Sequence, residues 1–277
     1  MARSTPRDVS RTSHHSDDMD SAPQLRNRFD EIFAQVARSD TLAAIWREVY
    51  EEDYPRDARP FSFVTVPELQ WLASTISVTG GRRFADLACG QGGPSLFVAR
   101  QTGASVIGID SSVVAVQAAT VAAQRSGISG RATFIAADAA ATGLRADSVD
   151  AAMSVDALQL MPHRSAVIAE VARILKPGGR FAFTTWVSRQ VDAGLPFPVD
   201  YQPLLDTVDL SLEWCHEPAN WEGRESAVFA RIRESAGILR AELGESVAAM
   251  LATEAAKMPD ALPLIRRVNI AARKAGS

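Results

Sequence analysis

The sequence predicts an α/β fold built on a doubly wound parallel sheet. Short apolar runs alternate with helical patterns between residues 83 and 186, which is typical of a parallel sheet with helices on both faces. The chain has 277 residues, 47% of them hydrophobic, and no internal repeat. This length and composition suit one domain that carries additions better than two independent domains.

The N-terminal region predicts a tail followed by helices. Residues 1–23 are rich in Ser, Arg, Asp and His without periodicity, which indicates a disordered tail. Apolar residues recur at helical spacing over residues 25–36 and again over 42–49. A charged, proline-punctuated linker covers 50–60. We expect residues 24–60 to form a helical cap over a ligand cleft rather than a device for binding a partner.

The stretch at residues 84–95 is the most informative, because an apolar strand ends there in small residues and a helix begins. Glycine lets the backbone approach a ligand closely, and free amides at a helix N-terminus attract anionic groups. A second apolar strand, 104–109, ends in Asp110. A carboxylate about 20 residues after such a loop accepts the hydroxyls of a ribose. The two loops therefore predict one site for a nucleotide-like ligand.

The spacing of the glycines distinguishes between cofactors. A dinucleotide loop that starts at Gly90 requires glycine at position 95, which is Ser95 here. The acid Asp86 followed by Gly90 and Gly92 instead resembles motif I of the class I S-adenosylmethionine-dependent methyltransferases. Ala88 departs from the family pattern of acid-x-Gly-x-Gly-x-Gly. Its side chain is small, so we expect the turn to survive with less freedom in φ.

The resemblance extends over residues 60–186. Residues 134–139 are similar to the family's third strand, 149–156 to the fourth strand, and 174–181 to the helix stop and turn before strand five. It implies a Rossmann-like sheet of seven strands whose last strand lies antiparallel between strands five and six.

The C-terminal part of the chain supplies the remaining elements of that fold. Strand six is expected at 210–214 and strand seven at 264–272. The methyltransferase domain then covers 61–277, with a mobile lid insertion after strand five at about 187–209 and helices at about 222–257. The insertion and the N-terminal cap are expected to roof a substrate pocket beyond the strand ends.

The resemblance also implies S-adenosyl-L-methionine as cofactor. The residues expected to bind it are Asp86, Ala88, Gly90, Gln91, Gly92, Asp110, Ser111, Asp138, Ala139 and Ser154. Asp138 would bond the adenine amino group, and Ala139 would offer a backbone amide. Taken singly, Asp110 is also compatible with a helix N-cap, and Asp138 with an ordinary loop acid. Their order at successive strand ends favours the cofactor site.

The implied reaction is methyl transfer from the sulfonium to O, N or C of a small, largely apolar metabolite, in specialised metabolism. Catalytic candidates are Asp156, at the exit of strand four, and His216, just after strand six. Asp156 either orients the acceptor or caps the turn. His216 is either a base with a suitable intrinsic pKa or a polar loop residue outside the cleft. Thr65 either closes on the methionine end of the cofactor or caps a helix.

Composition argues against other classes of function. The 33 acidic residues against 29 Lys and Arg give a net charge of −4, and no basic run with interleaved aromatics predicts nucleic-acid binding. Two cysteines form neither a metal quartet nor a disulfide framework, so we expect no metal and a cytoplasmic setting. No apolar segment reaches the roughly 18 residues of a membrane span. The sequence leaves open whether the protein forms a homo-oligomer.

Two alternatives to methyl transfer remain at this stage. One is a cyclase or rearrangement enzyme on the same fold that holds the cofactor structurally. The other is a non-catalytic cofactor-binding subunit, suggested by Ala88 and by the lack of an unambiguous base.

Overall fold

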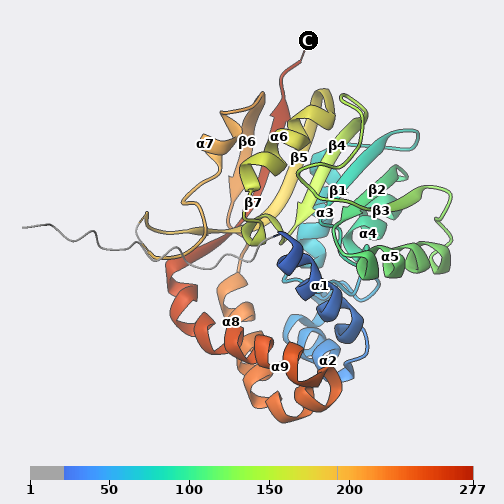
Figure 1. The fold of residues 1–277 in the computed structure, drawn as a ribbon. Helices are drawn as coiled ribbons and strands as arrows, with labels where there is room; N and C mark the ends of the chain where they lie inside the picture. The colour runs from blue at the N-terminus through green and yellow to red at the C-terminus, as the bar shows by residue number, and fades with distance from the viewer. Residues whose placement is uncertain (1–21, 192, 277) are drawn as a thin grey trace, which may run out of the picture.

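The computed structural model describes residues 22–191 and 193–276, so the tail predicted at 1–23 falls almost wholly outside the described residues. One sheet of seven strands has the order β3-β2-β1-β4-β5-β7-β6 (Figure 1). Neighbouring strands are parallel except β7, which runs antiparallel to both β5 and β6. The predicted fold class, including the antiparallel last strand, is confirmed.

The bounds of the elements follow chain order. The strands are β1 (Arg83–Leu87), β2 (Ser105–Asp110), β3 (Ala132–Ala136), β4 (Val149–Val155), β5 (Leu175–Ser188), β6 (Leu210–His216) and β7 (Ile265–Lys274). The helices are α1 (Ala22–Val36), α2 (Asp40–Tyr50), α3 (Val66–Ile76), α4 (Gly93–Thr102), α5 (Val113–Arg125), α6 (Arg164–Ile174), α7 (Gln202–Leu205), α8 (Trp221–Glu234) and α9 (Ala236–Ala261). Short 3-10 turns are η1 (Glu51–Asp53), η2 (Leu158–Leu160) and η3 (Leu262–Leu264).

The sheet separates two apolar layers. Phe84 of β1 packs in the layer formed with α3, α4 and α5, whereas Ala85 and Leu87 of the same strand pack in the layer with α6 and α7. Alternate residues of a strand point to opposite faces, so a strand buried on both faces has a continuous apolar run in its sequence. This explains why β1 and β4 were recognisable in the sequence.

A third apolar layer lies at the end of the sheet where the parallel strands finish. Helices α1, α2, α8 and α9 gather there (Figure 1), with Ile45 and Trp46 of α2 packed among Val228 and Leu243. The side chains of Ser39 and Thr41 donate to Glu242 of α9 at 2.5 and 2.8 Å, which ties the start of α2 to the C-terminal helices. The helices expected at 25–36 and 42–49 are thus α1 and α2, and α8 and α9 join them.

Several boundaries differ from expectation. β3 ends at Ala136 because the N–H of Ala137 makes the last bond to β2, at the carbonyl of Asp110, and Asp138 then turns the chain. Strand β7 begins one residue later than expected and continues to Lys274. Thr65 is the N-cap of α3, and with Glu68 it forms a reciprocal capping box. The capping interpretation of Thr65 accounts for its position.

Candidate active site

The loop after β1 is held by bonds to the end of β2. The N–H of Cys89 donates to the carbonyl of Ile109 at 3.0 Å, and the N–H of Gly90 donates to Asp110 Oδ2 at 2.8 Å. Ala88 adopts the left-handed region with φ of 55°. The turn therefore survives the replacement of the family's glycine, with alanine held in a strained backbone conformation.

Asp110 is pre-organised at the end of β2. Its Oδ2 accepts from Gly90, and its Oδ1 accepts from the N–H of Ser112 at 2.9 Å. A carboxylate oxygen has two acceptor positions, so each oxygen keeps one for a further donor. Burial raises the pKa of Asp110, the two N–H bonds lower it, and the charge of Asp30 raises it. The N-cap of α5 is Ser112, so the capping alternative for Asp110 does not apply.

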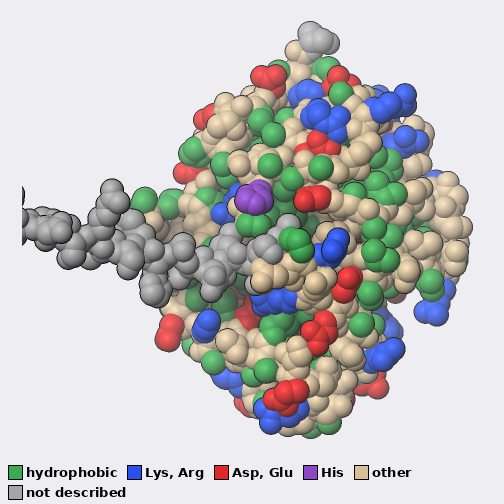
Figure 2. All heavy atoms as spheres, in the orientation of Figure 1, with side chains coloured by type: hydrophobic (Ala, Val, Ile, Leu, Met, Phe, Trp, Pro, Cys, Tyr) green, Lys and Arg blue, Asp and Glu red, His purple; other side chains and the backbone are tan. Residues whose placement is uncertain are grey.

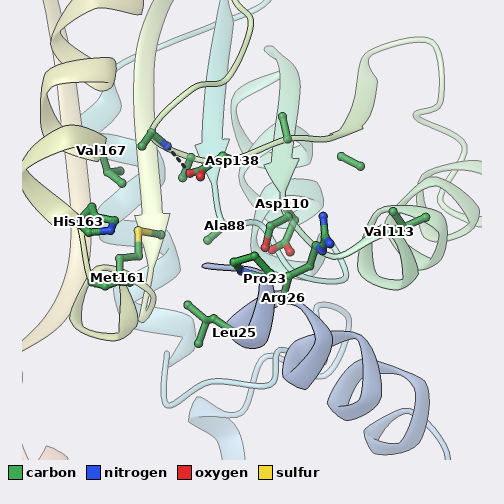
Figure 3. A pocket seen from close by; sticks show the side chains of 16 residues that line it. Pro23, Leu25, Arg26, Ala88, Asp110, Val113, Asp138, Met161, His163 and Val167 are labelled. Carbon is green, nitrogen blue, oxygen red and sulfur yellow. Dashed lines mark hydrogen bonds between the residues drawn. The ribbon is translucent and has the colours of Figure 1, made fainter. Parts of the chain in front are cut away.

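A cavity of about 380 Å³ opens over the ends of β1, β2 and β3 (Figure 3). It falls within the ~300–1,000 Å³ typical of small-molecule sites. Figure 3 shows Ala88, Asp110 and Asp138 on one side and Met161 and His163 on another. The full lining is Pro23, Leu25, Arg26, Ala88, Asp110, Ser111, Val113, Ala136, Ala137, Asp138, Ala139, Ala140, Met161, Pro162, His163 and Val167.

The structure distributes the ten expected cofactor residues over three positions. Five line the cavity, namely Ala88, Asp110, Ser111, Asp138 and Ala139. Three, Gly90, Gln91 and Gly92, form the adjoining loop at the start of α4. The remaining two, Asp86 and Ser154, are buried beneath that loop.

The two buried members support the loop from below. Ser154 donates to the carbonyl of Leu87 at 2.9 Å, and Ser95 of α4 donates to Asp86 at 2.5 Å. Burial raises the pKa of Asp86 to about 7, the bond from Ser95 lowers it, and the charge of Asp110 raises it. These contacts join β4, β1 and α4 under the site, so direct cofactor contact by these two residues stays a prediction.

Helix α1 covers the loop. A Cβ added at Gly90 would lie 3.3 Å from the Phe33 ring, and Gln91 donates to the carbonyl of Phe33 at 3.1 Å. Asp30 accepts from the side chain of Ser112. Figure 3 shows Pro23, Leu25 and Arg26, at the start of α1, facing Ala88 and Asp110. The amphipathic pattern predicted a helix, but not which residues would contact the cavity.

A fully buried arginine stands at the same edge of the sheet, on β7. Arg267 donates from Nε to Glu68 of α3 at 2.9 Å and from Nη2 to Asp156 at 2.8 Å. Its Nη1 lies 3.6 Å from Glu225 of α8, too far for a hydrogen bond. We call these four residues the buried charge cluster. In the sequence, this cluster is indicated only by an arginine, Arg267, within the apolar pattern of β7.

The acids of the cluster differ in their environment. Asp156 accepts from Arg267, from Thr184 Oγ1 at 2.6 Å and from the N–H of Phe63 at 2.9 Å. Glu225 accepts from the indole N–H of Trp186 at 3.3 Å. Burial raises the pKa of Glu225 to about 8, Arg267 lowers it, and Asp156 raises it. The pKa of Glu225 therefore lies well above its ordinary value of 4.5.

The two expected catalytic residues share one face of the sheet. His216 pairs in register with Asn269, and Asn269 pairs with Thr184, whose hydroxyl donates to Asp156. The His216 ring lies edge-on to Trp71 of α3 at 5.3 Å. Neither Asp156 nor His216 lines the 380 Å³ cavity. With its oxygens engaged by three donors, Asp156 is placed to position its neighbours, and catalytic roles for both residues stay predictions.

Aromatic rings cover the buried charge cluster. Phe63 lies 5.7 Å from both Trp46 and Trp186 and 5.3 Å from Phe229. Phe197, from the insertion after β5, packs on Trp186 at 5.9 Å. Aromatic side chains from the N-terminal segment, from α8 and from the insertion after β5 therefore pack next to the buried charge cluster.

Within residues 22–191 and 193–276, no helix has the length and apolar character needed to span a membrane. The same residues hold no group of three His, Cys, Asp or Glu side chains suited to a metal ion. Burial raises the pKa of the Cys89 thiol, so the nucleophilic thiolate is disfavoured there. On the face that Figure 2 shows, acidic and basic side chains are intermixed.

Comparison with known proteins gives independent information on the family. Residues 85–183 match the family described as "Methyltransferase domain". Methyltransferase GfsG of Streptomyces halstedii is 35% identical over 118 residues, which are 43% of this chain and 42% of that protein. A sterol 24-C-methyltransferase of Gibberella zeae is 30% identical over 128 residues, 46% of this chain and 34% of that protein. The chain thus spans less than half the length of these curated relatives.

Among solved structures, the cyclase SpnF has a TM-score of 0.73 and 22% identity, covering 93% of this chain and 97% of that one. At this identity the likeness shows the fold. The match to a methyltransferase domain at 85–183 agrees with the strand order and the antiparallel β7. Residues 85–183 therefore form a methyltransferase domain, and the sheet has the architecture that the resemblance to the class I S-adenosylmethionine-dependent methyltransferases implies.

Proposed function

We propose that this protein binds S-adenosylmethionine in the 380 Å³ cavity and transfers its methyl group to a small, largely apolar metabolite of specialised metabolism. The observation that carries the proposal is Asp110, whose two oxygens are fixed by Gly90 and Ser112 and still face the cavity. That arrangement suits the two hydroxyls of a ribose.

The residues beyond Asp110 fit the rest of an adenosyl group. Asp138, whose Oδ1 accepts from the N–H of Ala140 at 2.8 Å, stands at the end of the next strand. Ala137, Ala139 and Met161 give apolar walls for a flat base. The amino-acid end would extend along the loop of Gly90 and Gly92, below α1. Asp86 and Ser154 would act by holding that loop.

The bound sulfonium supplies an activated methyl group, so the protein's task is mainly to align donor and acceptor and to exclude water. Alignment of this kind is worth roughly 7–11 kcal/mol of a barrier. Helix α1 and the aromatic rings around Phe63 serve the exclusion of water. The apolar character of those rings supports an apolar acceptor, as do the substrates named for the sterol methyltransferase relative.

Calorimetry and isotope transfer test the proposal together. Titration with S-adenosylmethionine and S-adenosylhomocysteine should show one site per chain, and methyl-labelled cofactor should label a metabolite in an organic extract. Asp260→Ala is the matched control for Asp110→Ala, because Asp260 is an exposed acid at the end of α9. The proposal is refuted if neither S-adenosylmethionine nor S-adenosylhomocysteine binds at millimolar concentration.

A second function is favoured by the extent of the likeness to the cyclase SpnF, which covers almost the whole chain and not only the methyltransferase domain. In that case the cofactor is held structurally, and a substrate packed against the aromatic rings around Phe63 undergoes the cyclisation. Product formation without label transfer distinguishes it. Tight cofactor binding without any product would instead indicate a non-catalytic subunit.

A further inference from the structure

The buried charge cluster contains two unsatisfied polar atoms. Among the described residues, neither Arg267 Nη1 nor Glu225 Oε2 has a hydrogen-bond partner. Both side chains are almost completely buried, at 1% and 0% exposure. A buried unpaired donor or acceptor costs about 1–3 kcal/mol, more when it is charged. Such a pair therefore favours a ligand whose polar group can bond to both side chains.

The chemistry of the two atoms defines that group. Arg267 Nη1 only donates, and Glu225 in its ionised form, the form that can act as a base, only accepts. Nη1 and Glu225 Oε1 are 3.6 Å apart, so no direct hydrogen bond closes the gap. A hydroxyl group satisfies both sides, because its oxygen accepts from the guanidinium while its proton is donated to the carboxylate.

The charges of the cluster further restrict the class of ligand that can bond to Arg267 and Glu225. One guanidinium already faces the carboxylates of Asp156 and Glu68 at hydrogen-bond distance. A phosphate or carboxylate on the acceptor would add negative charge to a buried site that has no spare cation among its members. The occupant is thus an alcohol on an apolar molecule and not an acid.

The position of the cluster suits an acceptor. β1, β4, β5 and β7 are successive neighbours, and adjacent strands lie about 4.8 Å apart. Asp156 follows β4, directly beside the β1 loop that borders the cavity, and Arg267 reaches back to it from β7. The aromatic rings of Phe63 and Trp186 provide the apolar wall.

We propose that Arg267 and Glu225 hold the hydroxyl group of the acceptor, with Glu225 as the base that receives its proton; this inference rests on the proposed methyl transfer. The hydroxyl oxygen forms the new bond to the sulfonium methyl carbon. The carbon–sulfur bond breaks, its electron pair stays on sulfur as the thioether, and the hydroxyl proton passes to Glu225 Oε2. Asp156 and Glu68 position the guanidinium.

The electrostatic surroundings of Glu225 support this role. It faces Tyr50 of α2, Glu68 of α3, Asp156 after β4, Trp186 of β5 and Arg267 of β7. Burial together with the charges of Asp156 and Glu68 raises its pKa to about 8, against the lowering effect of Arg267 and Trp186. A base with a pKa near the working pH is suited to proton removal.

The test uses three probes that share one ring system: naphthalenemethanol, its methyl ether, and naphthalenemethylamine. Binding is measured by calorimetry on the full chain saturated with S-adenosylhomocysteine. We expect the alcohol to bind at least tenfold more tightly than the ether in the wild type. Glu225→Gln should remove most of that preference, whereas Glu222→Gln, an exposed acid on the same helix, should keep it.

Methyl transfer gives the second readout. Label transfer to the alcohol should rise with pH up to about 8 in the wild type, and Glu225→Gln should lower it at least ~100-fold and flatten that profile. Arg267→Lys keeps the charge and should weaken alcohol binding about tenfold if it folds. If it does not fold, the Glu225→Gln comparison stands on its own.

Several outcomes overturn the inference. Equal binding of alcohol and ether in the wild type would indicate a bridging water instead, and methylation of the amine in preference to the alcohol would indicate a different acceptor atom. Failure of all three probes to bind the chain saturated with S-adenosylhomocysteine also refutes it. Failure of S-adenosylhomocysteine itself to bind refutes the proposed function, so the two failures are distinguishable.

Discussion

The 380 Å³ cavity and the buried charge cluster lie over neighbouring strands at the same end of the sheet, but they are assembled in different ways. The acids of the cavity, Asp110 and Asp138, follow consecutive strands and are fixed by backbone N–H groups of their own loops. The cluster joins Glu68, Asp156, Glu225 and Arg267, from four elements far apart in the chain.

This difference in construction predicts how much each site contributes to the stability of the fold. When a loop acid held by local amides is removed, the protein loses little stability beyond the hydrogen bonds of that acid. A buried ion pair leaves an uncompensated charge when one partner is removed. We therefore expect substitutions in the cluster to affect folding and substitutions at the cavity to affect ligand binding.

The largest expected effect is that of Arg267→Met. It leaves Asp156 and Glu68 buried without their counter-charge, which costs about 3–5 kcal/mol in the free energy of unfolding. Denaturant unfolding followed by circular dichroism measures it. Arg273→Met is the matched control on the same strand, because Arg273 is 42% exposed and pairs with Glu213 at the surface. There the loss should stay below ~1 kcal/mol, and equal losses would contradict the contrast.

Glu225 predicts a pH dependence of stability. Its pKa in the folded protein, about 8, lies above the ordinary value of 4.5, so the folded state holds a proton that the unfolded state has released between these pH values. The contribution of Glu225 to the free energy of unfolding therefore falls as pH rises from 4.5 to about 8. Unfolding curves across this range should show a smaller decline in Glu225→Gln. An unchanged pH slope in that variant would mean that Glu225 is ionised in the fold.

At the cavity, Asp110→Ala should leave the fold intact and weaken cofactor binding by about 1.5–3 kcal/mol, the range for hydrogen bonds to a charged group. Calorimetry with S-adenosylhomocysteine measures the change, with Asp260→Ala as control. A dissociation constant equal to that of the wild type would remove Asp110 from the site. A large loss of stability would remove the distinction between the two regions.

The smallest effect is expected at Ala88. With φ of 55°, alanine bears a strain of about 1–2 kcal/mol that glycine avoids, while glycine adds about 0.4–1 kcal/mol of unfolded-state entropy. Ala88→Gly should therefore stabilise the protein by up to about 1 kcal/mol, seen as a higher midpoint of denaturant unfolding. A lower midpoint would show that the left-handed conformation carries no strain at this position.

The two regions also differ in how far the sequence anticipated them. Asp110 was found because it ends an apolar run, and Asp138 because residues 134–139 resemble the family's third strand. Parallel strands bring their carboxyl ends together. Asp86 was found as the acid that precedes Gly90 and Gly92 in motif I. Its position beneath the loop follows from its hydrogen bond with Ser95. The direction of a side chain at a strand end depends on such packing.

By itself, the sequence determined the order of strands and helices, the loop at residues 88–92 and the acids at the strand ends, because hydrophobic periodicity and turn chemistry act over a few neighbouring residues. Only the tertiary structure decided that Phe33 covers Gly90 and that Glu225 approaches Arg267. Those contacts depend on how α1 and α8 fold back over the sheet. That geometry is fixed by the packing of whole apolar faces, which no local pattern specifies.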